Sequence, residues 1–355
     1  TYITRYKQET GTLPEDGTEE MNELAEKFIE ESNPQRLKKT KLDIKTKGQQ
    51  RPAVILSDGT VIDGNRRFTC IRQLQHEEHE ARYLRCFVLD SELDDKSLKG
   101  LELELQFGQD EKVAYDPISR LVDIYEWCRV GDLDTEYYRT KCGMSKADMD
   151  SFLGQADLMV EFLQFINADG QFHIVQDLKL QGSLESLYNA TKKCHDEDLI
   201  EDLKIAVFAN CLTKSVGDST RHVRKMCDIA LSAEGDSFLE EQIEIAQDIL
   251  ETFEKLPEGK NVSTDFIREV VRADKDIVRK QEASFERSQR LMNNEKVKNG
   301  QVKEVEKAKL GLEKVAPELM PKLSKEALDS IKSSLTDIHK LVDDLEDAVN
   351  QALEA

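Results

Sequence analysis

Residues prone to form β-strands occur only in the first hundred or so positions of this 355-residue chain. Residues 53–56 and 61–62 flank turn residues at 57–59, which predicts a small hairpin, and residues 83–90 form the next convincing strand. After them, apolar residues recur at helical spacing. The sequence therefore predicts an α+β N-terminal domain followed by a larger all-α region.

The same patterns divide the chain into five segments. The opening stretch carries Gly and Pro with few apolar residues, and Thr18, a residue type that caps helices, precedes the first amphipathic pattern. We expect an N-terminal arm of uncertain order over 1–17, a mixed domain over 18–112, a helix-turn-helix-like domain over 113–170, a helical domain over 171–273 and a C-terminal helical arm over 274–355.

The C-terminal arm carries the strongest periodic pattern in the chain. From Ile331 to Ala352 the seam positions alternate spacings of four and three, which gives an a/d seam about three heptads long. Pro317 and Pro321 separate this seam from a charged, weakly apolar helical stretch before it. The arm is expected to be a helical hairpin or coiled coil. Its seam either pairs within the chain or binds a second copy or another protein.

Charge and cysteine usage limit the classes of function. The formal net charge of −21 repels nucleic acid and acidic membranes, so any DNA contact needs a local basic patch. The seven cysteines are scattered without a C-x-x-C pair, which indicates reduced thiols and not a zinc site. No apolar run approaches a membrane span, and no charged-then-apolar leader opens the chain. We expect a cytoplasmic protein of bacterial type that makes no contact with a membrane.

The stretch "GTVIDGNRRFTCIRQL" places two arginines at a glycine turn between a strand and a helix. Gly64 can adopt positive φ and lets backbone amides approach a ligand, and the helix that follows presents its unpaired N–H groups there. Arg66 and Arg67 add forked donors that suit phosphate oxygens. The stretch can therefore cradle a polyphosphate, and Asp63 could hold a metal or cap the helix.

An alternative is that this glycine turn is an ordinary one, with its arginines paired to the nearby acids Glu77 and Glu78. A basic run lies directly before the turn, since residues 34–51 hold seven Lys and Arg against the single acid Asp43. Such a composition is typical of a solvated loop. It could also contact nucleic acid or feed a polyphosphate site.

The order of these motifs resembles the ParB and sulfiredoxin-like superfamily. The match begins with "GQQRPAVILSDGTVIDGNRRFTCIRQL" and continues through the strand "YLRCFVLD" to the acidic helix "GLELELQ". Gly48, Pro52, Gly64, Arg66 and Arg67 stand at the places of the ParB motifs. The later stretch "TEYYRTKCGMSKADMDSFLGQADLMVEFL" looks like the helix-turn-helix that follows in ParB.

This resemblance implies a nucleotide site for CTP or ATP with Mg²⁺, and a slow triphosphatase activity that gates a DNA clamp. It implies a phosphate- and base-binding set composed of Gln50, Arg51, Pro52, Gly64, Asn65, Arg66 and Arg67. Glu104 and Asp63 are the candidate metal carboxylates, with Glu102 as the less favoured alternative to Glu104 and Gln106 as a polar neighbour. The family's Glu after the glycine is Asn65 here, and its E-N-x-x-R motif has no literal match, so binding is implied more strongly than hydrolysis.

The helix-turn-helix offers few groups for DNA. Lys141, Lys146 and Gln155 are the candidate DNA-binding residues, but acids outnumber bases over residues 131–165. We interpret these helices as keeping the helix-turn-helix fold, either without the ability to bind DNA or as a docking surface for another protein.

Three related functions are alternatives. Asp63, Gly64 and Arg67 satisfy the D-G-x-x-R box of the ParB-like free serine kinases, so a small-molecule kinase is one, and a nuclease of the superfamily is another. A scaffold with a degenerate nucleotide site is the third. Sulfiredoxin activity needs a cysteine where this chain has Asn65. The preferred hypothesis is a protein that binds a nucleoside triphosphate and thereby switches DNA or protein binding.

Overall fold

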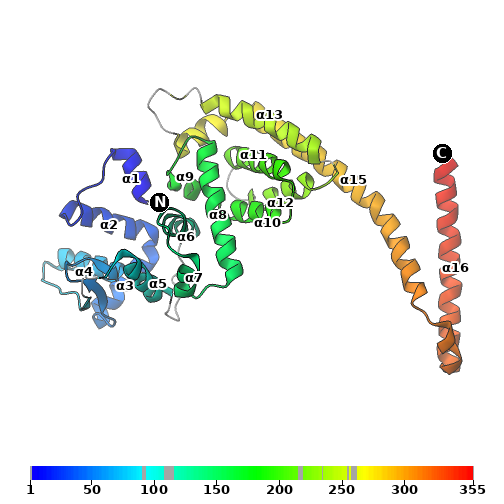
Figure 1. The fold of residues 1–355 in the computed structure, drawn as a ribbon, viewed down its shortest axis with the longest axis horizontal. Helices are drawn as coiled ribbons and strands as arrows, with labels where there is room; N and C mark the ends of the chain where they lie inside the picture. The colour runs from blue at the N-terminus through cyan, green and yellow to red at the C-terminus, as the bar shows by residue number, and fades with distance from the viewer. Residues whose placement is uncertain are drawn as a thin grey trace. The chain divides into compact units, whose positions relative to one another are not determined.

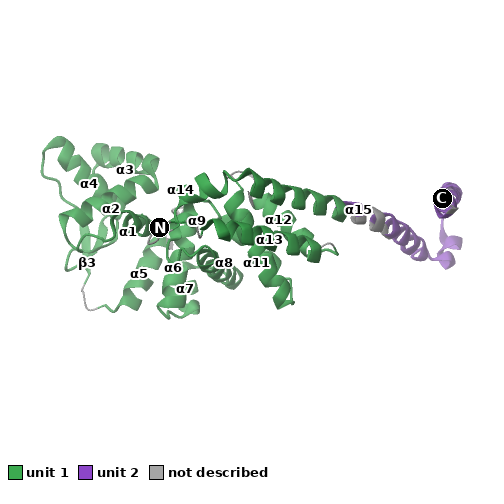
Figure 2. Cartoon of the chain, turned by 90° about the horizontal axis from the view of Figure 1, so that it is seen from above, with its two compact units in different colours: residues 1–292 green, residues 293–355 purple. Residues whose placement is uncertain are grey.

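The computed structural model is mostly helical, with one small three-stranded sheet in its N-terminal part (Figure 1). The residues that it describes are 2–89, 93–107, 116–214, 219–233, 235–253, 256 and 262–354. The chain forms two compact units, Thr1–Met292 and Asn293–Ala355 (Figure 2). The prediction of strands near the N-terminus followed by a larger helical region is confirmed at this level.

The sheet has the strand order β2-β1-β3. Strands β1 (Ala53–Leu56) and β2 (Val61–Asp63) form the expected antiparallel hairpin. Helix α4 (Asn65–Glu78) then crosses over to β3 (Cys86–Leu89), which pairs with β1 in parallel. The turn at Gly64 therefore joins the end of an edge strand to the start of the crossover helix.

Three further helices complete the N-terminal part, namely α2 (Glu19–Ser32), α3 (Pro34–Lys47) and α5 (Asp95–Phe107). The Thr18 hydroxyl accepts a hydrogen bond from the Met21 amide at 3.2 Å, so the predicted cap of α2 is present. Helix α3 packs along α4, and the core between them consists of Leu37, Ile44, Cys70, Ile71 and Leu74. This packing holds α3 beside the glycine turn.

Part of the expected N-terminal arm is a helix, α1 (Tyr2–Thr10). The Tyr2 ring stacks on Phe28 of α2 with 5.5 Å between centroids. On the other side, the Gln8 amide donates to the Val262 carbonyl at 2.9 Å. These contacts join α1 both to the N-terminal helices and to the helical region.

The rest of the first unit is a bundle of helices around the largest apolar core, to which Leu121, Met159, Phe162, Phe208 and Phe238 contribute fully or almost fully buried side chains. Its elements are α6 (Pro117–Tyr125), a π-helix (Glu126–Val130), α7 (Thr135–Cys142), α8 (Lys146–Phe165), α9 (Phe172–Asp177), α10 (Gln181–Thr191), α11 (Glu197–Thr213), α12 (Ser219–Ala230), α13 (Gly235–Phe253), α14 (Thr264–Phe266), a second π-helix (Ile267–Val271) and the first part of α15 (Lys275–Glu313). Among the described residues, no helix combines the length and apolarity needed to cross a bilayer.

Helix α5 shares a core with the helical region. Its Leu103 is fully buried in one cluster with Ile124 of α6 and Tyr138 of α7. The boundary expected at residue 112 lies outside the described residues. Helix α5 contacts β2 of the N-terminal part as well as α7 of the helical region, so it packs against the elements on both sides of that boundary.

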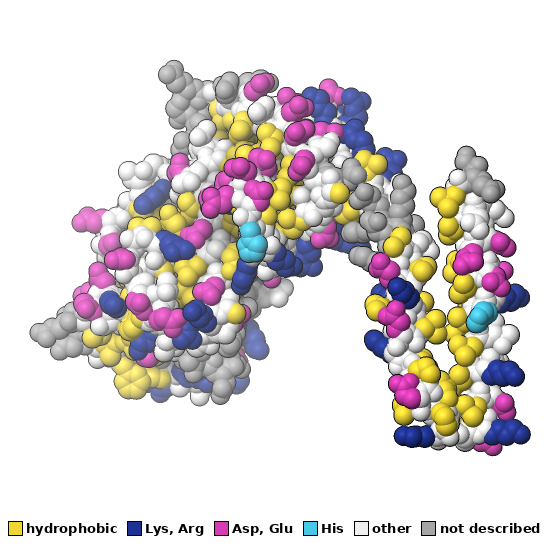
Figure 3. Space-filling view, turned by 45° about the vertical axis from the view of Figure 1, so that its right-hand side comes forward, with side chains coloured by type: hydrophobic (Ala, Val, Ile, Leu, Met, Phe, Trp, Pro, Cys, Tyr) yellow, Lys and Arg dark blue, Asp and Glu magenta, His cyan; other side chains and the backbone are white. Residues whose placement is uncertain are grey.

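The second unit contains the end of α15 (Lys275–Glu313), a 3-10 helix (Pro317–Lys322) and α16 (Lys325–Glu354). The helix, proline break and second helix follow the expected order. Most of the apolar seam of α16 is exposed, and apolar side chains stand open along the helix (Figure 3).

Candidate functional site

The glycine turn has the backbone geometry that the sequence predicted. Gly64 has φ of 106°, and a Cβ at this position would lie 2.8 Å from the Cβ of buried Ala53. As the N-cap residue of α4, glycine has no side chain to bond the first N–H groups of the helix. The first turn of α4 therefore presents backbone donors and the positive end of the helix dipole.

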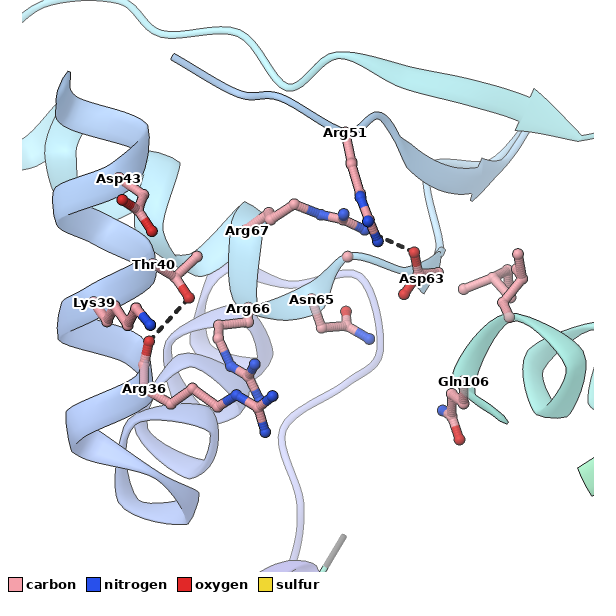
Figure 4. A pocket seen from close by; sticks show the side chains of 13 residues that line it. Arg36, Lys39, Thr40, Asp43, Arg51, Asp63, Asn65, Arg66, Arg67 and Gln106 are labelled. Carbon is pink, nitrogen blue, oxygen red and sulfur yellow. Dashed lines mark hydrogen bonds and ion pairs between the residues drawn. The ribbon is translucent and has the colours of Figure 1, made fainter. Parts of the chain in front are cut away.

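The basic run before the turn is helical, so the expectation of a solvated loop is wrong. Pro34 occupies the first position of α3, and the Asn33 side chain accepts a hydrogen bond from the Arg36 amide at 3.0 Å. The helical repeat then places Arg36, Lys39, Thr40 and Asp43 on one face. This face is directed toward the start of α4 (Figure 4).

The two helices, the β1–β2 hairpin and α5 line an open pocket of about 570 Å³. Its lining residues are Arg36, Lys39, Thr40, Asp43, Arg51, Ile62, Asp63, Gly64, Asn65, Arg66, Arg67, Leu105 and Gln106. Five of these are cationic and two are acidic. In a chain with a net charge of −21, this pocket is a local concentration of positive charge.

Several of the pocket cations lack counterions. The Arg67 guanidinium donates to the Asp63 carboxylate at 2.7 Å, but its buried Nε has no hydrogen-bond partner. Within the described part of the chain, the side chains of Arg36, Lys39 and Arg66 make no hydrogen bond or ion pair. The arrangement leaves donors and positive charge available to an anion.

Burial lowers the pKa of Arg66, and the positive charges of Arg36 and Arg67 lower it further. Arginine stays protonated despite such shifts. The direction of the shift means that the surroundings oppose the charge of Arg66. An anion in the pocket would relieve this repulsion.

The alternative pairing of the two arginines with Glu77 and Glu78 is wrong. Glu77 binds Lys41, and Glu78 binds Lys45 and Arg82. These two acids therefore neutralise other bases.

The phosphate-binding residues expected from the sequence separate into two groups. The pocket brings together Arg51, Gly64, Asn65, Arg66 and Arg67. Two others do not line it. The Gln50 side-chain amide donates to the Lys47 carbonyl at 2.5 Å, and Pro52 leads into β1.

The structure does not bring the two candidate metal carboxylates together. The Glu104 carboxylate binds the Lys141 ammonium of α7 at 2.6 Å and does not line the pocket, whereas Asp63 is paired with Arg67. The described residues contain no group of three His, Cys, Asp or Glu side chains placed to hold a metal. A Mg²⁺ ion held mainly by protein carboxylates does not fit this arrangement.

The candidate DNA-binding residues are dispersed. Lys141 is neutralised by Glu104, and Gln155 is only 3% exposed and donates to the Ser151 hydroxyl at 3.0 Å. Lys146 is exposed at the first position of α8. The expectation that Gln155 contacts DNA does not agree with its burial, because a side chain in the core cannot reach a base edge.

Sequence reasoning missed the contribution of α3 as a pocket wall. The signal was present, because Asn33-Pro34 is a helix start and the polar residues after it recur at spacings of three and four. Gln106 of α5, which was expected as a polar neighbour of the site, lines the pocket and donates to Glu102 at 2.8 Å. The place of α3 beside the turn depends on its tertiary packing against α4.

No family model, curated protein or solved structure matches the chain. The resemblance to ParB thus remains a prediction based on motif order, and the pocket has to be interpreted from its own chemistry.

Proposed function

We propose that the protein binds a nucleoside triphosphate, CTP or ATP, through its phosphates at the Gly64 turn. The observation that supports this most strongly is the convergence of five cationic side chains with only two acids around an uncapped helix start. Arginine forks and backbone N–H groups are the donors that proteins use for phosphate oxygens.

The size of the pocket agrees with such a ligand. Its volume of about 570 Å³ lies within the usual range of small-molecule sites. Four of the cations line the pocket from α3 and the start of α4, while Gln106 of α5 lies across from them (Figure 4). The phosphates would contact Arg36, Arg66 and Arg67, and the nucleoside would extend toward α5.

Magnesium enters this proposal as part of the ligand. The carboxylates of Asp63 and Glu104 are both ion-paired. The phosphate oxygens of the nucleotide would therefore coordinate the Mg²⁺ ion in place of protein carboxylates. The arginines would then hold the phosphate oxygens that the ion leaves free.

Helix α5 offers a route by which occupancy could switch the helical region. Gln106 lines the pocket, whereas Lys99 of the same helix is 3% exposed and forms an ion pair with Asp123 of α6. The Tyr138 hydroxyl of α7 donates to the same Asp123 carboxylate at 2.6 Å. A shift of α5 on nucleotide binding would therefore move partners in α6 and α7.

A protein is the preferred partner of the switched region, because of the buried Gln155 and the excess of acids over residues 131–165. DNA recognition needs exposed donors and positive charge, and this surface has few of either. Acidic helices can instead dock a basic protein surface.

Isothermal titration with CTP, ATP and GTP, and with the corresponding di- and monophosphates, tests the proposal. Each nucleotide is measured with and without Mg²⁺. We expect affinity to rise by roughly tenfold or more for each added phosphate, because each one gains charge-assisted hydrogen bonds. Failure of every triphosphate to bind, or equal affinity for a nucleoside and its triphosphate, would exclude this function.

A further inference from the structure

Most of the apolar seam of α16 is exposed, and only Ile331 and Ile338 among its large side chains are half-buried. Leu335, Val342, Leu345 and Val349 are 43%, 45%, 55% and 56% exposed. A shallow depression of about 410 Å³ along the first half of the helix is lined, among the described residues, by α16 side chains alone. Apolar side chains repeated in this way on a helix surface indicate a missing helical partner.

The apolar stripe at the end of α15 is too short to cover the whole seam of α16. Among the side chains that the structure describes there, its exposed large apolar residues are Val302, Val305, Leu310 and Leu312. With Ala308 they form an apolar stripe from Val302 to Leu312, which is about 15 Å long at 1.5 Å per residue. The seam of α16 runs from Leu328 to Ala352, about 36 Å at 1.5 Å per residue, so α15 could cover less than half of it.

We infer that α16 pairs with α16 of a second copy of the chain in an antiparallel coiled coil. In such a pair each a position faces a d position. The facing layers are Leu328 with Ala352, Ile331 with Val349, Leu335 with Leu345, and Ile338 with Val342, each formed twice by symmetry. Three of these layers pair a larger side chain with a smaller one, and the fourth pairs two leucines, so no layer combines two small residues.

A parallel pair would pack less well. It would place Ala352 opposite Ala352 at one end and Leu328 opposite Leu328 at the other. Its a positions would hold two Leu and two Val, which is not the β-branched-at-a pattern that favours parallel dimers. The layer composition therefore favours the antiparallel orientation.

Charge favours the same orientation. Residues 341–353 carry four acids and no base, whereas residues 325–340 carry three of each. A parallel pair brings the two acidic halves together, while an antiparallel pair sets each acidic half beside the neutral half of the other copy. Antiparallel pairing also places Lys332 near Glu346 of the second copy, on the flank of the seam.

This inference does not depend on the nucleotide site, and sedimentation equilibrium of the full chain tests it. We expect a dimer whose population grows with protein concentration. Leu345→Asp should weaken the dimer by more than about tenfold, since it buries a charge in the seam. Thr336→Asp adds the same charge on the exposed side of α16 and should change the dimer constant less than about twofold.

Cross-linking of cysteine variants tests the orientation. Leu328→Cys and Ala352→Cys chains are mixed and oxidised, and the linked peptides are identified by mass spectrometry, with the unmodified chain as the control for its native thiols. We expect disulfides between residue 328 of one chain and residue 352 of the other. Disulfides that join identical positions would overturn the antiparallel arrangement. A monomer at every concentration, or an assembly of more than two chains, would overturn the pairing itself.

Discussion

The contact of Gly64 with Ala53 provides a direct test of how the site is constructed. In Gly64→Ala the new Cβ would lie 2.8 Å from the Ala53 Cβ and 3.2 Å from its Cα, and Ala53 is fully buried. Gly59 in the same hairpin is a matched control, because its φ of 96° is similar but a Cβ there meets nothing within 4 Å. Both substitutions place alanine at a positive φ and carry the same backbone strain. Only Gly64→Ala adds a steric clash with Ala53.

The expected magnitudes follow from these two costs. Placing alanine at positive φ costs about 1 to 2 kcal/mol in either variant. Overpacking against Ala53 adds about 1 to 3 kcal/mol in Gly64→Ala alone. We therefore expect the free energy of opening of the hairpin to fall by about 2 kcal/mol more in Gly64→Ala than in Gly59→Ala.

Native-state hydrogen exchange of the β1 peptide measures this difference, because it reports local opening of the hairpin. About 2 kcal/mol corresponds to roughly thirtyfold faster exchange of the protected β1 amides in Gly64→Ala than in Gly59→Ala. Equal exchange rates in the two variants would refute the close approach of the turn to β1.

Three further predictions concern titration, thiol reactivity and DNA. Burial lowers the pKa of His173 to about 4, so the folded state binds a proton at His173 less readily than the unfolded state does. The free energy of unfolding should therefore be highest above about pH 6.5 and should fall as the pH is lowered toward 4. His173→Gln should flatten this part of a plot of urea midpoint against pH, and an unchanged slope would contradict the assignment. Burial raises the pKa of the Cys70 thiol to about 11, whereas Cys86 and Cys194 are half-buried, so a disulfide reagent at pH 8 should modify those two of the seven cysteines first, as peptide mapping would show. Fluorescence anisotropy should detect no duplex DNA binding near physiological salt, and binding with a steep salt dependence would show that a basic surface has been overlooked.

Local features of the fold could be predicted from the sequence because each depends on neighbouring residues. The positive φ of Gly64, the cap at Thr18 and the heptads of α16 are of this kind. The side of a helix that becomes buried depends on distant packing, which a single sequence does not specify. Gln155 was therefore expected at the surface, although α8 packs it into the core.

The site was predictable in part for the same reason. Arg66 and Arg67 follow Gly64 in the sequence, so their shared position was expected. Arg36 precedes them by 30 residues and reaches the pocket only because α3 packs along α4. Glu104 was expected to face the site, but it forms an ion pair with Lys141, since α5 turns that side toward α7.

We propose that the pocket cations bind the phosphates of a nucleotide. Titration of CTP and ATP into Arg66→Ala tests this binding, with Arg279→Ala as the control, because the Arg279 side chain is 81% exposed and forms an ion pair with Asp276 on α15. Loss of a charge-assisted contact worth about 1.5 to 3 kcal/mol should weaken nucleotide binding by roughly 10- to 150-fold in Arg66→Ala and leave it unchanged in Arg279→Ala. Unchanged affinity in an Arg66→Ala protein that retains its helical circular dichroism would contradict the claim.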